Sequence, residues 1–235
     1  MTETPRFGLT LLEAAQAQKH MTVNEALVRL DALAAVSLSG IDITEPPEAP
    51  VSGAVYAIGS GATADWAGAD GRLAIASGGG WQFADPWPGL RAWNAAQAGW
   101  WVHLGDGLWV AGAVAVSAGG AATLARVAEI DHSISPGSVS TISDAIPDKA
   151  VVLGISARVT SEITGAGSWR LGVGGSNNRY GSGFGGAIGS VAEGVTGSPV
   201  AYYGGTDLLI TAESGSFSAG ALRIAIHYWQ ISAPL

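Results

Sequence analysis

Residues 81–109 read WQFADPWPGLRAWNAAQAGWWVHLGDGLW and carry six of the nine tryptophans of the chain. Prolines and glycines recur through this stretch and divide it into segments too short for a long helix. We therefore predict short strands and turns that carry large aromatic side chains. Six indoles exceed what one small core usually needs, so they have two interpretations. They form either a surface that stacks on the apolar faces of sugar rings, or a core or subunit contact, which is the commoner role of large aromatic side chains.

The composition indicates a folded protein with few charges. The 235 residues are 48% apolar and 13% charged, and the formal net charge is −8. This balance argues against a nucleic-acid or anionic-membrane partner. The chain has no cysteine, which excludes disulfides and zinc-thiolate sites. We expect no cofactor and no metal.

The start of the chain lacks the pattern of a secretory signal. No basic segment is followed by an apolar run, and glycines interrupt the apolar stretches before the roughly 20 residues that a membrane span requires. We therefore expect synthesis in the cytoplasm without a signal peptide, and no membrane insertion.

Residues 1–43 are predicted to be a helical anchoring segment. Thr10–Glu13 and Thr22–Glu25 both fit the capping box, in which a threonine hydroxyl and a glutamate carboxylate bind the first free amides of a helix. Apolar residues then recur at helical spacing, which predicts a buried stripe made of Val23, Leu27, Leu30 and Ala34. A helix this short is marginal alone. We expect it to dock on a larger assembly or on copies of itself.

Residues 44–113 are predicted to form a small Trp-rich β module. The segment Glu45–Pro50 holds three prolines, which favour a stiff extended connector. Residues 53–59 and 72–76 are strand-like runs beside glycines, and Ala69-Asp70-Gly71 is a turn signal. The small residues of 114–122 indicate a linker after the module.

Residues 120–235 are predicted to form an antiparallel, jelly-roll-like β-sandwich, which makes the whole chain mainly β. The expected strands are 124–130, 150–160, 168–173, 208–212 and 221–232. Alternation in the last strand places Ile224, Ile226, Tyr228 and Gln230 on one face, and Arg223, Ala225, His227, Trp229 and Ile231 on the other. Neither face is wholly polar. We therefore expect a strand covered on both sides, as in a sandwich that also makes a subunit contact.

Catalytic signals are scarce, so we predict that the chain is not an enzyme. Residues 181–186 satisfy GxGxxG but lack the strand-turn-helix setting of a dinucleotide site, which favours a plain glycine-rich loop. Asp131-His132-Ser133 cannot form a relay, because adjacent residues on a strand point to opposite faces. Asp85 and Asp106 flank the aromatic stretch, which leaves a polysaccharide-degrading glycosidase as a minor alternative.

Several segments resemble an uncharacterised family of alphaproteobacterial prophages and gene transfer agents. The resemblance begins with Pro5–Leu9, Gln16–Leu27 and Leu30–Leu33, and it continues through 47–56, 66–70, 71–76 and 81–89. It therefore covers roughly residues 5–110, and the C-terminal part is similar to a β-domain that often follows in such chains. The resemblance implies a spike or fibre on the surface of a phage-like particle, similar to a gene transfer agent head spike. Such spikes are associated with attachment to the capsule of the recipient cell, and no catalytic residues can be transferred.

Two functional hypotheses follow. The first is a spike protein that binds cell-surface capsular polysaccharide, weakly at each site and usefully through many copies. The second is a purely structural virion connector without sugar binding. In both, the N-terminal segment contacts other spike or capsid proteins, and the chain forms a homo-oligomer, with a trimer favoured.

Two regions compete equally for the glycan contact. The first is the aromatic group Trp87, Trp93, Trp100 and Trp101. The second comprises glycine-rich loops of the C-terminal domain, which combine amides, a guanidinium and phenols: Asn177, Asn178, Arg179, Tyr180, Tyr202 and Tyr203. Ordinary turn chemistry is the alternative interpretation of these loops, since asparagine and glycine are favoured in turns.

Overall fold

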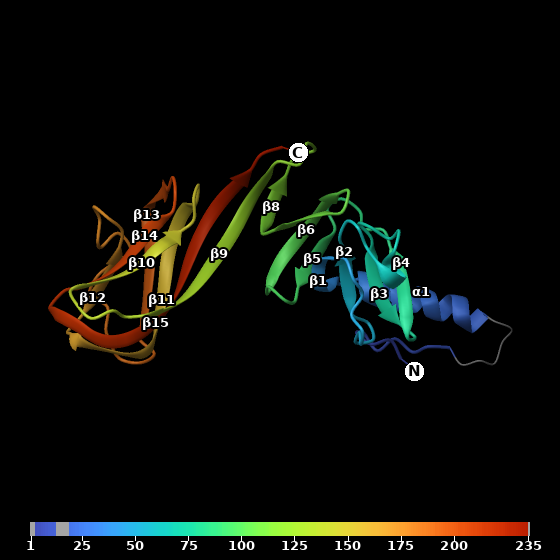
Figure 1. Cartoon of the computed structure of the whole chain (residues 1–235), viewed down its shortest axis with the longest axis horizontal. Helices are drawn as coiled ribbons and strands as arrows, with labels where there is room; N and C mark the ends of the chain where they lie inside the picture. Colours follow the sequence, from blue (N-terminus) through green and yellow to red (C-terminus); the bar gives the residue numbers. More distant parts are fainter. Residues whose placement is uncertain (1–2, 13–18, 235) are drawn as a thin grey trace. The chain divides into compact units, whose positions relative to one another are not determined.

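A computed structural model describes residues 3–12 and 19–234 of the chain (Figure 1). The chain divides into two compact units, residues 1–113 and 114–235, which we call the N-terminal and the C-terminal unit. Each unit has its own hydrophobic core. The fold is mainly β, as predicted.

The N-terminal unit combines one α-helix, α1 (Lys19–Leu33), and a single turn of 3-10 helix, Ala64–Trp66, with a seven-stranded sheet. The strands in chain order are β1 (Ser37–Ile43), β2 (Val55–Ile58), β3 (Leu73–Ser77), β4 (Gly80–Ala84), β5 (Arg91–Asn94), β6 (Gly99–Gly105) and β7 (Leu108–Ala111). Their order in the sheet is β4-β3-β2-β1-β5-β6-β7. The central strand β1 runs parallel to both β2 and β5, and the other pairs are antiparallel.

Strand β1 differs from the expectation that residues 1–43 are helical. Leu38 of β1 is fully buried and pairs with Val55 on one side and Asn94 on the other. Gly40 obscures the strand pattern in the sequence. A side chain at this position is disfavoured, because a Cβ there would lie 2.8 Å from the Ile43 side chain. The segment that was expected to end the anchor is therefore the middle of the sheet. The strands expected at 53–59 and 72–76 are present as β2 and β3.

The helix begins earlier than the second capping box predicts. Thr22 lies inside α1 and does not cap it, so that prediction is wrong. The neighbouring Asn24 binds the chain instead: its side-chain amide accepts a hydrogen bond from the Leu12 N–H at 2.8 Å and donates one to the Leu12 carbonyl at 3.0 Å. The first capping box ends at Glu13. Residues 13–18, which belong to the expected helical segment, lie outside the described residues.

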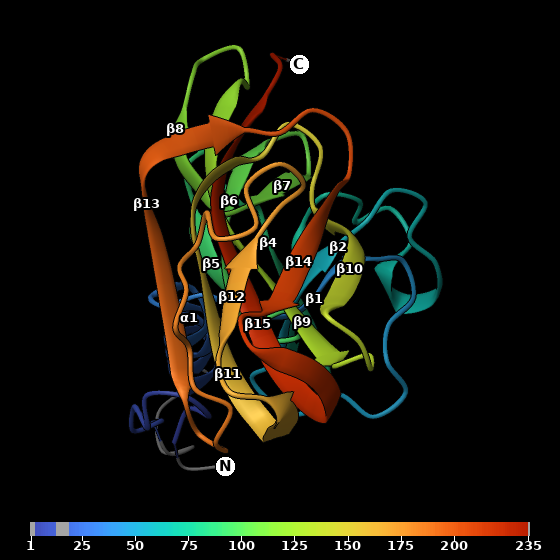
Figure 2. The ribbon, with the colours of Figure 1, turned by 90° about the vertical axis from the view of Figure 1, so that its left-hand side faces the viewer.

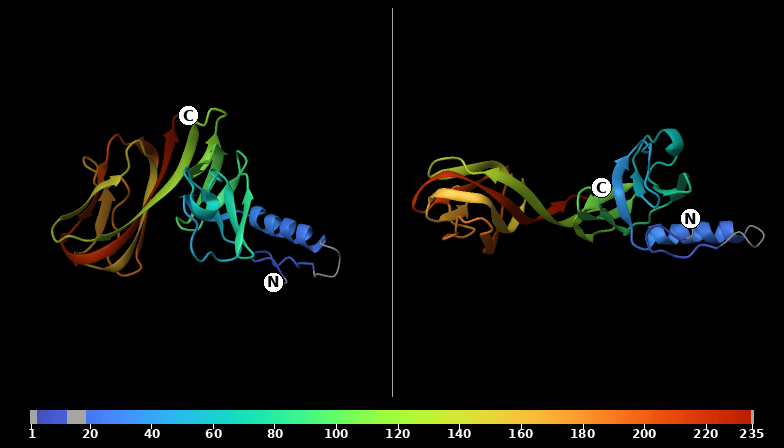
Figure 3. Two further views of the ribbon diagram at one scale, coloured as in Figure 1. Left: turned by 45° about the vertical axis from the view of Figure 1, so that its right-hand side comes forward. Right: turned by 90° about the horizontal axis from the view of Figure 1, so that it is seen from below.

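The buried face of α1 also differs from the predicted stripe. Val28, Asp31 and Ala32 are buried, whereas Val23 and Leu30 are exposed. The reason is Asp31, whose carboxylate accepts hydrogen bonds from Thr4 Oγ1 at 2.8 Å, from Arg6 N at 3.0 Å and from Phe7 N at 2.5 Å. Holding residues 4–7 in this way turns Asp31 inward and the predicted stripe outward. Figure 3 shows α1 beside the seven-stranded sheet, and Val28 and Ala32 belong to the core of that sheet.

The C-terminal unit is a sandwich of two antiparallel sheets (Figure 2). Its strands are β8 (Ala113–Val116), β9 (Ala122–Ser133), β10 (Val139–Ile146), β11 (Val151–Ala166), β12 (Trp169–Gly172), β13 (Val191–Ala201), β14 (Thr206–Ala212) and β15 (Gly215–Ser232). The larger sheet has the order β13-β11-β15-β9-β8 and the smaller one β10-β14-β12.

The five strands expected in this unit are present, although most are longer than predicted. Strands β10 and β13 were not predicted, and the expected linker at 114–122 begins with β8. Strand β13 escaped detection because Gly194, Gly197 and Pro199 interrupt its apolar pattern. Such residues are tolerated there because β13 is an edge strand.

The alternation predicted for β15 is confirmed. Leu222, Ile224 and Ile226 are fully buried in the core between the two sheets, whereas Arg223 and Trp229 on the other face are exposed. That outer face is not covered by any part of the chain that is described in this unit. Among residues 3–12 and 19–234, no helix is both long and apolar enough to span a membrane.

Candidate carbohydrate-binding surface

Two tryptophans form an exposed platform on the β5–β6 hairpin of the N-terminal unit. Trp93 and Trp100 are direct cross-strand partners, and their ring centroids lie 5.4 Å apart at an interplanar angle of 76°. The two residues are 37% and 59% exposed. Edge-to-face packing of this kind fixes the orientation of both rings. The hairpin therefore presents two large aromatic surfaces to solvent in a defined geometry.

The turn of this hairpin is held by a buried amide. Asn94 is 2% exposed, and its Oδ1 accepts hydrogen bonds from the N–H groups of Ala96 at 3.0 Å and Gln97 at 3.3 Å. This arrangement is a side-chain-stabilised turn directly beside the tryptophan pair. The platform consequently rests on a rigid hairpin.

Polar groups flank the tryptophan pair. Arg91 precedes Trp93 by two residues on β5 and therefore lies on the same face of the sheet, where it is exposed. Ser37 of β1 is the direct neighbour of Trp93 in the parallel pairing. Sequence reasoning missed both residues, although the period-two spacing of Arg91 and Trp93 was a usable signal. A guanidinium and a hydroxyl at this position can pair with sugar hydroxyls.

The remaining tryptophans of the 81–109 stretch divide between surface and core. Trp87 is 52% exposed in the turn between β4 and β5, where its carbonyl accepts a hydrogen bond from Leu90 N–H at 3.0 Å. Trp101 points to the opposite face from Trp100 and packs against the sheet core, and Trp109 is buried there. Trp101 is therefore mainly a packing residue. The structure exposes Trp87, Trp93 and Trp100 of the predicted group.

The structure corrects the predicted exposure of Tyr180 and Tyr202. Both were predicted in accessible loops, yet they are 1% and 8% exposed, and their hydroxyl oxygens lie 2.7 Å apart in the core of the C-terminal unit. Burial, and next the hydrogen bond with Tyr202, raise the pKa of the Tyr180 phenol far above its ordinary value. Rings enclosed in this way cannot stack on a sugar.

The other predicted residues of the C-terminal unit remain at the surface. Asn177, Asn178 and Tyr203 are exposed, and Arg179 is half-buried. The GxGxxG segment at 181–186 forms part of the same loop between β12 and β13, with no helix after it, so it is not a dinucleotide site. With Tyr180 in the core, the asparagine loop lacks the aromatic ring on which its predicted role depended.

The Asp131-His132-Ser133 relay considered in the sequence is not assembled. His132 Nε2 lies 2.8 Å from Ser140 Oγ, whereas Asp131 accepts two hydrogen bonds from Arg223, each at 2.8 Å. These contacts confirm that Asp131, His132 and Ser133 form no relay. The first contact joins the two sheets, and the second joins β9 to its neighbour β15.

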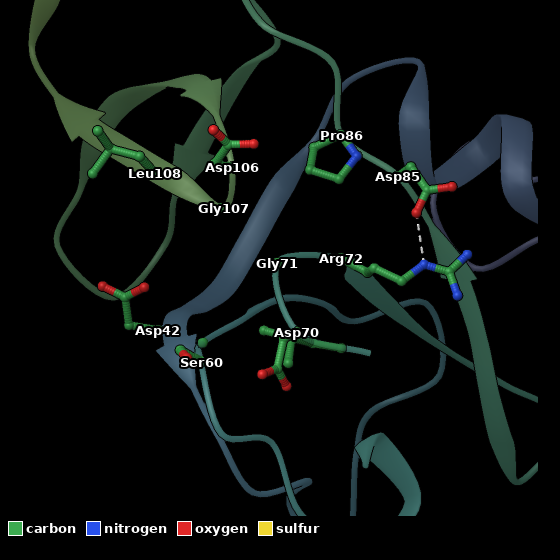
Figure 4. A pocket seen from close by; sticks show the side chains of 12 residues that line it. Asp42, Ser60, Asp70, Gly71, Arg72, Asp85, Pro86, Asp106, Gly107 and Leu108 are labelled. Carbon is green, nitrogen blue, oxygen red and sulfur yellow. Dashed lines mark hydrogen bonds and ion pairs between the residues drawn. The ribbon is translucent and has the colours of Figure 1, made fainter. Parts of the chain in front are cut away.

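A cavity of about 580 Å³ in the N-terminal unit contains both carboxylates that were considered for glycoside hydrolysis (Figure 4). Asp85 and Asp106 line it together with Asp42 and Asp70. The Asp85 carboxylate accepts a hydrogen bond from Arg72 Nε at 2.7 Å. Asp70 accepts hydrogen bonds from Gly61 N–H and Ala62 N–H, which lower its pKa. The two carboxylates therefore line one cavity, in which Asp85 is paired with Arg72.

Comparison with known proteins shows that part of the chain is similar to a protein family. Residues 23–110 match the model of the family described as "Protein of unknown function (DUF2793)". The chain has no match among curated proteins.

Two solved structures show weak similarity. One is a chain of the cyanophage Pam1 capsid asymmetric unit, for which 45% of this chain aligns with 84% of that chain at 21% identity and a TM-score of 0.35. The other is a chain of the Bacillus endospore appendages, described as a novel family of disulfide-linked pili, for which 49% aligns with 96% at 16% identity and a TM-score of 0.21. Scores of this size carry no conclusion about fold or function.

Proposed function

We propose that the protein is a structural spike or fibre component of a phage-like particle, and that it binds cell-surface polysaccharide through the Trp93–Trp100 platform. The observation that carries the proposal is the exposed, edge-to-face tryptophan pair on a rigid hairpin. Exposed tryptophans cost solvation free energy, so a fixed pair of them is typical of a binding surface. The resemblance of residues 5–110 to a prophage and gene transfer agent family supports the particle context.

The chemistry of the platform suits a sugar chain. The C–H face of a pyranose ring is apolar and stacks on an indole, while its hydroxyl groups need hydrogen-bond partners. Trp93 and Trp100 provide the stacking surface, and Arg91 and Ser37 provide the polar partners on the same face. Such a contact is weak for one site. Many copies on one particle turn weak contacts into firm attachment.

The test is a pull-down of the purified protein with capsular polysaccharide, followed by titration of the fragments that bind. Trp93→Ala and Trp100→Ala are each expected to weaken binding by about tenfold, which corresponds to about 1.4 kcal/mol of stacking free energy. Trp87→Ala shows whether the nearby turn contributes. Tyr203→Ala tests the competing region, because Tyr203 is 83% exposed in the C-terminal unit.

The outcomes separate the two predicted regions. Unchanged binding by folded Trp93→Ala and Trp100→Ala variants, together with lost binding by Tyr203→Ala or Asn178→Ala, would move the site to the C-terminal unit. Thermal unfolding of each variant shows that the fold is retained.

A purely structural connector is the second candidate, and a specific feature favours it. Met21, Val23 and Leu30 are 55%, 40% and 56% exposed on the outward face of α1, where a partner protein can cover them. A connector binds the particle through this face and shows no sugar-dependent signal. Absence of any polysaccharide binding by the unmodified protein therefore selects the connector and rejects the platform.

A further inference from the structure

The outer face of the five-stranded sheet exposes an unusual amount of apolar surface. Its exposed apolar side chains, with their exposed fractions, are Val127 (62%), Val191 (51%), Val195 (84%), Trp229 (46%) and Ile231 (77%), and Tyr203 (83%), which follows β13, borders the same face. Together they place several large apolar side chains in water on one face of the unit. A monomer seldom leaves a patch of this size uncovered.

The strand pairing shows that these residues form one surface. Val127 of β9 lies opposite His227 of β15, and Trp229 of β15 lies opposite Val151 of β11. A hollow of about 540 Å³ lies at the end of the face that carries Trp229. It is lined mainly by apolar side chains, among them Leu153, Trp229 and Ile231. The apolar residues therefore run together along adjacent strands, and they border a depression that can receive apolar side chains.

The charges on this face are close to balanced, although the whole chain carries −8. At the end away from Trp229, Arg223 pairs with Asp131 at 2.8 Å and with Glu129 at 3.6 Å. Arg158 and Glu193 lie beside them on β11 and β13, and neither takes part in an ion pair within the described ranges 3–12 and 19–234. Two copies that approach through this face therefore avoid the repulsion of the net charge, and they offer each other an unpaired guanidinium and an unpaired carboxylate.

We infer that the outer face of the β13-β11-β15-β9-β8 sheet is the contact surface between copies of this chain. The occupant is a second copy, because the charges of this face are self-complementary and its exposed apolar side chains border a depression that can receive those of a second copy. Four of the six exposed residues are aliphatic, and aliphatic side chains present no flat ring to a sugar. The self-contact is thus distinct from the sugar contact proposed for the N-terminal unit.

The first test measures the mass of the full chain by light scattering and analytical ultracentrifugation from 1 to 100 µM, roughly the range over which protein contacts of moderate affinity form. The unmodified protein is expected to form a dimer or trimer. Val127→Lys combined with Ile231→Lys is expected to raise the dissociation constant at least about tenfold. The control is Ile188→Lys, which changes a 70% exposed isoleucine in the loop between β12 and β13. A monomer at every concentration, or assembly of the double variant equal to that of the unmodified protein, overturns the inference.

A second variant pair keeps the inference testable if the lysine variant does not fold. The chain has no cysteine, so one introduced thiol is a unique site. Val127→Cys should be captured as a covalent dimer by a short bis-maleimide, whereas Ile188→Cys should not. Two outcomes would assign the self-contact to another surface and reject the one proposed. The first is cross-linking through Ile188→Cys but not through Val127→Cys. The second is dissociation of the oligomer by Leu30→Lys in α1 but not by the lysine variant of the sheet.

Discussion

Tyr180 and Tyr202 exchange a hydrogen bond between two phenols in the core of the C-terminal unit, and this pair has a measurable energetic signature. Tyr180→Phe leaves the buried Tyr202 hydroxyl without its partner, and we expect it to lower the free energy of unfolding by about 1–3 kcal/mol. Tyr180→Phe combined with Tyr202→Phe removes both hydroxyls and should cost less than the single change. Urea unfolding of the two single variants and the double variant gives the coupling. Additive losses would contradict a shared hydrogen bond.

His132 predicts a pH dependence of the same unit. Partial burial lowers the pKa of its imidazole below the ordinary value of 6.5. Between that lowered value and 6.5 the unfolded chain binds a proton that the folded chain does not bind, so the stability falls as the pH is lowered through this interval. We expect the melting temperature of the C-terminal unit to fall as the pH drops from 7.5 towards 5.5. His132→Gln should flatten this slope, and an equal slope in the variant would reject His132 as its cause.

Strand β13 shows how a glycine can be required at one position and optional at another. A Cβ at Gly194 would overlap the carbonyl oxygen of Tyr180, whereas a Cβ at Gly197 meets no atom within 4 Å. Gly194→Ala is therefore expected to cost about 1–3 kcal/mol through overpacking. Gly197→Ala, the matched control in the same strand, should change stability by less than about 0.5 kcal/mol. Similar unfolding midpoints for the two variants would show that the loop carrying Tyr180 moves away without cost.

Among the strands, those with a clear alternation of apolar and polar residues could be predicted from the sequence. Strands whose pattern is interrupted could not. Residues 221–232 alternate clearly, and the buried face of β15 was predicted correctly. Strand β1 was missed because Gly40 and Asp42 interrupt its apolar pattern, and because its parallel pairing depends on distant strands. The orientation of α1 was missed because it is set by the bonds of Asp31 to residues 4–7, which lie far away in the sequence.

The candidate site was predictable as a group of tryptophans but not as a surface. The composition of residues 81–109 indicated aromatic side chains for binding or packing, and pairing register then decided which of them face solvent. Trp100 and Trp101 are adjacent in sequence, yet they point to opposite faces of the sheet. Tyr180 occupies a glycine-rich loop, which suggested exposure, but tertiary packing encloses it.

For the whole molecule, the position of β1 changes how anchoring can be tested. Deleting residues 1–40 would remove most of the central strand and the buried Val28, Ala32 and Leu38, so we expect the N-terminal unit to unfold. Point changes on the exposed face of α1 avoid this problem. Met21→Lys with Leu30→Lys should leave the melting temperature nearly unchanged and prevent incorporation into particles. Normal incorporation of this folded variant would show that the chain attaches elsewhere.

The twelve-residue pairing of β9 with β15 determines how the C-terminal unit responds to tension. Ala122 lies opposite Ser232 at one end of this ladder, and the Ala122 N–H donates a hydrogen bond to Ser232 Oγ at 3.0 Å. A force that pulls Ala122 away from Ser232 breaks the hydrogen bonds between β9 and β15 one after another, because both residues lie at the same end of the pairing. A force applied along the strands must instead break many of these inter-strand hydrogen bonds at the same time. The unit is therefore mechanically weak between residues 122 and 232.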